Sequence, residues 1–184
     1  MDRLQALEEL DKHLKNKNLI RHSLAVEAVM RALAKHFDED GEIWGMAGLL
    51  HDLDYEDTEN DWTQHGVLTE QWLSEYDLSA ETINIIKAHN ADAIGITPET
   101  RAEKAIYAID PLTGLITAAA LMQPSRKIAD LSPHSVLKKY KNKKFAAGAS
   151  REHIATCENF GLPLEKFIEI SLTAMQGICS ELGL

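Results

Sequence analysis

Apolar residues recur at spacings of three and four along most of the chain, which is the pattern of amphipathic helices. The first such face is formed by Leu4, Leu7, Leu10 and Leu14. Similar patterns cover residues 19–37, 42–53, 63–76, 80–89, 99–122, 151–160 and 164–182, and a further helix opens at Pro133. No stretch of any length shows the alternation of a half-buried strand. The pattern predicts an all-α fold, a compact helical bundle with additional C-terminal helices.

Capping residues and helix breakers set the expected boundaries. Thr63 and Ser79 suit the N-cap position of the helices that follow them. Residues 54–61 are acidic and residues 90–98 contain Gly and Pro, so both segments are predicted loops. Pro111 is expected to kink or restart the helix over 99–122, because proline lacks an N–H group and crowds the preceding turn.

Length and charge narrow the class of protein. A chain of 184 residues suggests one domain, here residues 1–184, with a core of about 18–121 and a C-terminal helical extension of about 125–184. The net charge of -10 argues against a nonspecific nucleic-acid binder. The sequence shows no signal-peptide pattern and no apolar run near the ~18 residues of a membrane span. We therefore expect a cytoplasmic protein without a membrane partner, either monomeric or dimeric.

Histidine and aspartate side chains that suit a metal stand in several of the predicted helices or at their ends. Asp110 ends the apolar run 105–109, where burial of a carboxylate is costly without a partner cation. Metal coordination is one way to make that burial tolerable. In chain order the candidates are His22, His51, Asp52, His65, His89 and Asp110. Because helical bundles build metal sites from facing helices, this order predicts a metal site.

These motifs resemble the HD superfamily of metal-dependent phosphohydrolases, whose signature is a His, a His-Asp pair and a distant Asp on a helical core. Residues 21–26 are similar to the first motif, residues 47–52 to the second and residues 108–110 to the last. The similarity covers about residues 18–121. It implies that one metal is held by His22, His51, Asp52 and Asp110.

His65 and His89 extend the resemblance to superfamily members with two metals, such as HD-GYP phosphodiesterases and symmetrical diadenosine tetraphosphate hydrolases. In that scheme Asp52 bridges the metals, and His65 and His89 bind the second. The chain departs from the HD-GYP pattern, since Asn90 follows His89 where those proteins carry a paired histidine. Residues 93–98 also stand in place of the Gly-Tyr-Pro loop. These departures argue against cyclic di-GMP as the substrate, and the chain after Leu121 matches no named pattern.

Phosphate-ester hydrolysis needs an activated water and neutralisation of charge on the phosphoryl oxygens, and a divalent metal supplies both. Mixed imidazole and carboxylate ligands suit Fe, Mn, Zn, Co or Ni better than Mg, and one or two ions remain possible. The predicted activity is that of a phosphohydrolase, either a phosphomonoesterase or a phosphodiesterase. It would act on a small nucleotide or related phosphate ester through a metal-bound hydroxide, with Asp52 as a catalytic residue.

Five further residues are candidates for roles beyond metal binding. Asp54 is a predicted catalytic residue that orients a ligand histidine or the water, although it could instead cap the acidic loop. Lys104 either reaches the phosphate as a catalytic cation or is a solvated helix lysine. Lys143 and Lys144 belong to the basic run 138–144, a predicted substrate-binding rim whose alternative is a solvated surface. Arg151, near a helix N-terminus, is a predicted phosphate contact.

Two other functions remain open at this point. The chain could be a non-catalytic regulatory module that keeps a metal for its structure, or a di-iron oxygenase like some members of the superfamily. The histidines outside the motifs are expected to be surface or capping residues; they are His13, His36, His134 and His153.

Overall fold

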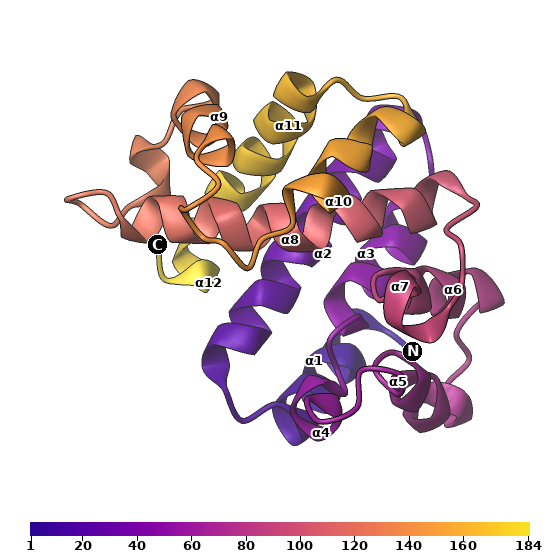
Figure 1. The fold of residues 1–184 in the computed structure, drawn as a ribbon. Helices are drawn as coiled ribbons and strands as arrows, with labels where there is room; N and C mark the ends of the chain where they lie inside the picture. The colour runs from indigo at the N-terminus through magenta and orange to yellow at the C-terminus, as the bar shows by residue number, and fades with distance from the viewer.

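The computed structural model describes residues 1–184, and the fold is all-α, with helices, turns and no strand (Figure 1). The longer helices are α1 (Arg3–His13), α2 (Lys17–Phe37), α3 (Gly41–Leu50), α6 (Ala80–Ala88), α8 (Arg101–Leu121), α9 (Pro133–Lys141) and α11 (Leu164–Gly177). The shorter helices are α4 (Tyr55–Thr58), α5 (Val67–Trp72), α7 (Ala91–Ile94), α10 (Arg151–Ala155) and α12 (Cys179–Leu182). Three 3₁₀ segments are η1 (Leu73–Glu75), η2 (Ile128–Asp130) and η3 (Thr156–Phe160).

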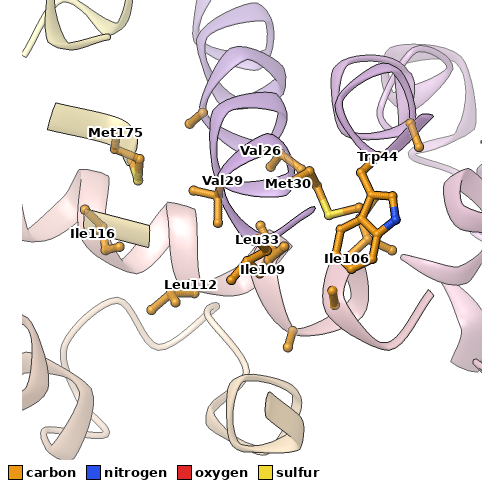
Figure 2. Packing of buried hydrophobic residues seen from close by; sticks show 14 of the residues in the cluster. Val26, Val29, Met30, Leu33, Trp44, Ile106, Ile109, Leu112, Ile116 and Met175 are labelled. Carbon is orange, nitrogen blue, oxygen red and sulfur yellow. The ribbon is translucent and has the colours of Figure 1, made fainter. Parts of the chain in front are cut away.

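Helix α2 lies at the centre of the fold and packs against α3, α8 and α11. In Figure 1, α8 crosses α2, with α9 and α11 above it and α1, α4 and α5 below it in this view. Figure 2 shows the buried side chains between the two helices, among them Val29 and Leu33 of α2 and Ile109 and Leu112 of α8. Their burial fixes α8 on α2, and the two helices carry the first and last of the predicted ligands.

The close approach of α3 to α2 depends on Gly48. The N-cap of α3 is Asp40, whose carboxylate accepts two N–H groups of the first turn. A Cβ atom at Gly48 would lie 3.1 Å from the backbone of Glu27 on α2, closer than nearly all real Cβ contacts. Because glycine has no side chain, the two helices pack backbone to backbone. This packing brings the C-terminal end of α3 beside α2.

Helix α8 runs without interruption from Arg101 to Leu121, although Pro111 lies inside it. Thr100 and Glu103 form a capping box at its start. The expected restart of the helix at Pro111 is therefore wrong, and the kink, the other expected outcome, stays a prediction. The helix packs against α2, α6 and α10, and this tertiary packing offsets the backbone hydrogen bond that proline cannot make.

By length and composition, α8 is also the one helix that could span a membrane. The sequence-based expectation that no run approaches this length is therefore corrected. Its buried residues, such as Ile106 and Ile116, belong to the apolar core of the fold. A buried core helix passes the same length and hydropathy test as a membrane span.

Several other predicted boundaries differ from the structure. The helix expected over 63–76 begins only at Val67, because Gly66 takes a left-handed backbone with φ +86. Thr63 is not a helix cap, since its N–H and hydroxyl groups both bond the carboxylate of Asp61. The predicted loops 54–61 and 90–98 contain the short helices α4 and α7. The last predicted helix is divided into α11 and α12.

The helices after α8 pack onto α2 and α8 rather than standing apart. Val136 of α9, Ile154 of α10 and Leu172 of α11 belong to the same apolar cluster as the buried residues of α2 and α8. The extent of the domain, with a core of about 18–121 and an extension of about 125–184, stays a prediction.

Candidate metal centre

The side chains proposed as metal ligands converge from separate helices and helix ends. They are His22 on α2, His51 and Asp52 after α3, His65 before α5, His89 after α6 and Asp110 on α8. Ligand atoms of five of them form two groups that share Asp52, namely His22, His51 and Asp52, and Asp52, His65 and His89. Asp110 adjoins the first group through His22 and His51.

The first group, together with Asp110, consists of two imidazoles and two carboxylates. His22 Nε2 lies 3.5 Å from Asp52 Oδ2 and 2.9 Å from Asp110 Oδ1. His51 Nε2 lies 3.5 Å and 3.9 Å from the same two oxygens. The two Nε2 atoms are 3.3 Å apart. Ligand atoms of His22, His51 and Asp52 therefore lie close together, with Asp110 Oδ1 beside the two histidines.

The second group uses the other oxygen of Asp52. Asp52 Oδ1 lies 3.2 Å from His65 Nε2 and 3.6 Å from His89 Nε2. The two Nε2 atoms are 2.8 Å apart. One carboxylate thus faces both groups, with Oδ2 toward the first and Oδ1 toward the second.

His51 and His89 are held by the helices that they follow. The Nδ1 atom of His51 lies 2.9 Å from the carbonyl oxygen of Gly48, and the Nδ1 atom of His89 bonds the carbonyl oxygen of Ile86. A carbonyl oxygen only accepts, so each Nδ1 carries the hydrogen and donates it. In the neutral ring, each Nε2 then presents a lone pair to the centre.

His65 and His22 are oriented in the same sense by side chains. His65 Nδ1 lies 2.7 Å from Asp54 Oδ1, which accepts its hydrogen. His22 Nδ1 lies 3.3 Å from the hydroxyl oxygen of Thr113. That hydroxyl donates its own hydrogen to the carbonyl oxygen of Asp110, so it accepts from His22. All four ligand histidines therefore direct Nε2 toward Asp52.

Asp54 is fully buried and connects His65 to the start of α5. Its Oδ2 atom accepts the N–H groups of Gly66 at 2.9 Å and Thr69 at 2.8 Å. The carboxylate makes no capping bond to its own helix α4. The contacts suit both roles considered from the sequence, since Oδ1 orients His65 while Oδ2 caps the N–H groups that lead into α5.

The donor set fits a divalent metal. Two neutral imidazoles whose lone pairs face each other repel, and a cation between them removes that repulsion. Ligands at about 2.0–2.2 Å from one metal stand roughly 3 Å or slightly more from each other, which matches the spacings in both groups. His22, His51, Asp52 and Asp110 fit one ion, and Asp52, His65 and His89 fit another. Imidazole and carboxylate ligands leave the identity of the metal open.

Without a metal, the charges of the centre are balanced by protons. Burial raises the pKa of Asp52, but the surrounding histidines outweigh burial and keep that pKa below its usual value. Burial lowers the pKa of His65, whereas the hydrogen bonds to Asp52 and Asp54 raise it to about 9. Burial and the neighbouring histidines lower the pKa of His89 to about 4. A metal in the second group would replace the proton that His65 shares with Asp52.

A family model described as the HD domain matches residues 19–115. The match covers more than half of the chain and includes the whole of both groups. The chain belongs to the HD domain family. No curated protein and no solved structure matches it significantly. The HD domain places the chain in a superfamily of metal-dependent hydrolases, and the buried His/Asp cluster suits the divalent metal that such domains bind.

The HD domain centre opens into a cavity of about 420 Å³. Besides ligand residues, its walls are formed by Leu19, Tyr55, Trp62, Asn90 and His153. A second cavity beside it is lined by His22 and Asp110 and by Ala146, Gly148 and Ala149 from the segment after α9. The segment after α9 therefore lies beside the first metal group.

The predicted cations do not all reach the HD domain centre. Lys104 lines a different cavity, together with Arg101 and residues of η3 and its end. Lys143 and Lys144 are exposed and lie in the same segment as Ala146. The structure thus places Lys104 at a different cavity, and it places Lys143 and Lys144 in the exposed part of the segment whose Ala146 lines the second cavity.

Arg151 is occupied by the protein itself. Its guanidinium group donates to carbonyl oxygens of α9 and of the segment after it, including those of Tyr140, Phe145, Ala146 and Ala149. In the structure Arg151 therefore holds this segment in place, and its donors are not free for a phosphate group.

Several residues at the HD domain centre escaped the sequence analysis. His153 was expected at the surface or as a cap, yet it lines the cavity. Tyr55 and Trp62 lie edge-to-face, with ring centroids 5.4 Å apart, and both also line it. Thr113 orients His22. Only Thr113 carried a signal in the sequence, because a residue three positions after Asp110 lies on the same helix face.

Proposed function

We propose that this HD domain protein is a metal-dependent phosphohydrolase that acts on a small nucleotide or a related phosphate ester. The observation that carries the proposal is the position of Asp52. Its two oxygens face two separate pairs of histidine Nε2 atoms, and each ring is oriented by a hydrogen bond on its far side. When bound, divalent ions there supply an activated water and neutralise charge on phosphoryl oxygens.

In this proposal the residues of the chain have distinct roles. His22, His51, Asp52 and Asp110 hold the first ion, and Asp52 with His65 and His89 holds the second. Asp54 is a positioning residue, because it touches His65 and two backbone N–H groups but does not face the cavity.

The substrate would occupy the cavity over the metal ions. The walls of this cavity include Trp62, Asn90 and His153 of α10. Lys143 and Lys144 would attract its negative charge toward the cavity. The chain as a whole carries a net charge of -10, so local cations near the site matter for an anionic substrate. We propose that the protein acts in the cytoplasm.

The test is metal-dependent release of phosphate. The protein is loaded separately with Mn²⁺, Fe²⁺, Zn²⁺, Co²⁺ or Ni²⁺ and incubated with nucleoside mono-, di- and polyphosphates and with simple phosphate mono- and diesters. We expect turnover of at least one ester and its loss on chelation. Asp52→Asn should lower turnover by at least about 100-fold, since even loss of a ligand's hydrogen-bond partner costs about 10- to 100-fold.

The matched control is Asp57→Asn, which makes the same change at an exposed aspartate on α4. This variant should retain wild-type turnover and metal content. Metal-loaded protein that hydrolyses none of these esters would contradict the proposal and favour the non-catalytic module.

A further inference from the structure

Three side chains from three helices meet beside the cavity, and one of them, His153, lines it. Asp92 of α7 accepts the hydroxyl hydrogen of Tyr107 of α8 at 2.9 Å. The same carboxylate oxygen lies 3.2 Å from Nε2 of His153 on α10. The rings of His153 and Tyr107 are stacked, with centroids 4.2 Å apart and planes inclined by 23°. One carboxylate and one aromatic face therefore fix the position of the His153 ring.

This cluster adjoins both metal groups. Tyr107 precedes Asp110 by three residues on α8, which is about one helical turn. Asp92 follows His89 by three residues. His153 lines the same cavity as Asp52 and Asp110. It lies outside residues 19–115, so the family match assigns it no role.

The cluster leaves one ring nitrogen of His153 for a ligand. Nε2 contacts Asp92 and His153 lines the cavity, so Nδ1 is the ring nitrogen that the cluster does not use. Burial and the hydrogen bond to Asp92 raise the pKa of Tyr107 to about 12, so its hydroxyl stays a donor at neutral pH. The Tyr107 hydroxyl thus keeps the carboxylate of Asp92 oriented toward His153.

We propose that His153 is the catalytic acid that protonates the departing oxygen of the phosphate ester, an inference that rests on the proposed phosphohydrolase function. Water attacks phosphorus, the bond between phosphorus and the ester oxygen breaks, and its electron pair stays on that oxygen. The His153 imidazolium gives its proton to the oxygen, which leaves as an alcohol. The proton lost by the attacking water goes to solvent, and solvent protonates His153 again.

Two neighbouring side chains position His153 for this role. Asp92 faces it from α7 and Tyr107 from α8. Asp110 lines the same cavity as His153, and Glu152 precedes His153 on α10. Asp92 and Tyr107 act as positioning residues, because the carboxylate of Asp92 contacts Nε2 of His153 and the Tyr107 ring stacks on the imidazole.

The experiment compares His153→Gln with His134→Gln, which makes the same change at an exposed histidine of α9. Two phosphate esters are compared. Both are monoesters if the wild type hydrolyses monoesters, and both are diesters if it hydrolyses diesters. One carries a p-nitrophenyl group, whose oxygen is stable as an anion near neutral pH, and the other carries a nucleoside alcohol. Loss of the acid should lower kcat for the nucleoside ester by about 10²- to 10⁴-fold and change kcat for the aryl ester by less than about tenfold.

A second readout does not depend on turnover. In protein loaded with Zn²⁺, addition of inorganic phosphate should shift the ring resonances of His153 in NMR spectra and leave those of His134 unchanged. Asp92→Asn should show a smaller loss confined to the nucleoside ester, and Asp92→Glu should restore part of it. Metal content should be unchanged in every variant.

The possible failures are distinguishable. Equal losses on both esters, no loss on either, or a His153 ring that does not respond to phosphate would overturn the assignment of His153 alone. If the metal-loaded wild type hydrolyses neither ester class, the proposed function fails and the assignment fails with it.

Discussion

Replacement of Asp54 by asparagine should remove the second metal while leaving the fold nearly intact. The carboxylate accepts three hydrogen bonds, one at Oδ1 from His65 and two at Oδ2 from the N–H groups of Gly66 and Thr69. Asparagine has one accepting oxygen and one donating NH₂ group. Its single oxygen can therefore accept either from His65 or from the two backbone N–H groups, but not from both.

The cost of each orientation decides the outcome. If the amide oxygen replaces Oδ1, two buried N–H groups lose their acceptor, at about 1–3 kcal/mol each. If the oxygen replaces Oδ2, both backbone bonds remain and the NH₂ group faces Nδ1 of His65. His65 then meets it as the tautomer with hydrogen on Nε2, which is unable to bind a metal. The second orientation retains the hydrogen bonds, so we expect it to prevail.

Isothermal titration with Zn²⁺ or Mn²⁺ and elemental analysis test this expectation. Asp54→Asn should bind the first ion as the wild type does. It should lose the second ion or bind that ion about 10- to 100-fold more weakly, which is typical for loss of a group that supports a metal ligand. Asp57→Asn is the control. An Asp54→Asn protein that binds two ions with wild-type affinity would refute the reasoning, as would a loss of several kcal/mol in unfolding free energy with unchanged metal binding.

Three further predictions concern packing, ligand orientation and substrate attraction. Gly48→Ala should lower the free energy of unfolding by about 1–3 kcal/mol in urea denaturation, because the new Cβ meets the backbone of α2. The control is Gly114→Ala, which should be neutral or stabilising, because a Cβ there has nothing within 4 Å. Thr113→Val should weaken binding of the first metal by about 10- to 100-fold in the same titration, and unchanged affinity would exclude the hydroxyl as an orienting group. Replacing Lys143 and Lys144 by alanine should raise KM and reduce its dependence on salt without changing kcat; identical salt dependence would remove the two lysines from the substrate path.

Much of the fold was predictable because its helices carry a strong apolar periodicity. Helices α2, α8 and α11 bury a continuous face, and their sequences show it at spacings of three and four. The short helices α4 and α7 were missed, since a single turn has no periodicity to detect. The restart expected at Pro111 followed a local rule that tertiary packing on α2 and α6 overrode.

The cluster of candidate ligands was predictable for a different reason. The ligand types and their order along the chain are visible in the sequence, and the family match covers the same residues. The supporting contacts are not visible there. Asp54 reaches Thr69 over fifteen positions and His153 reaches Asp92 over more than sixty, so both contacts depend on how the helices pack. The phosphate contact predicted for Arg151 failed for the same reason. The sequence places Arg151 at a helix N-terminus, but it does not show that the guanidinium group donates to carbonyl oxygens of the segment after α9.

We propose that Asp52 stands between two metal ions. The most direct measurement is the metal-to-protein ratio of the purified chain by elemental analysis, with Asp52→Asn measured beside it. We expect a ratio near two for the wild type and loss of both ions in the variant. A ratio near one would remove His65 and His89 from the metal site, and a protein that retains no transition metal would contradict the account.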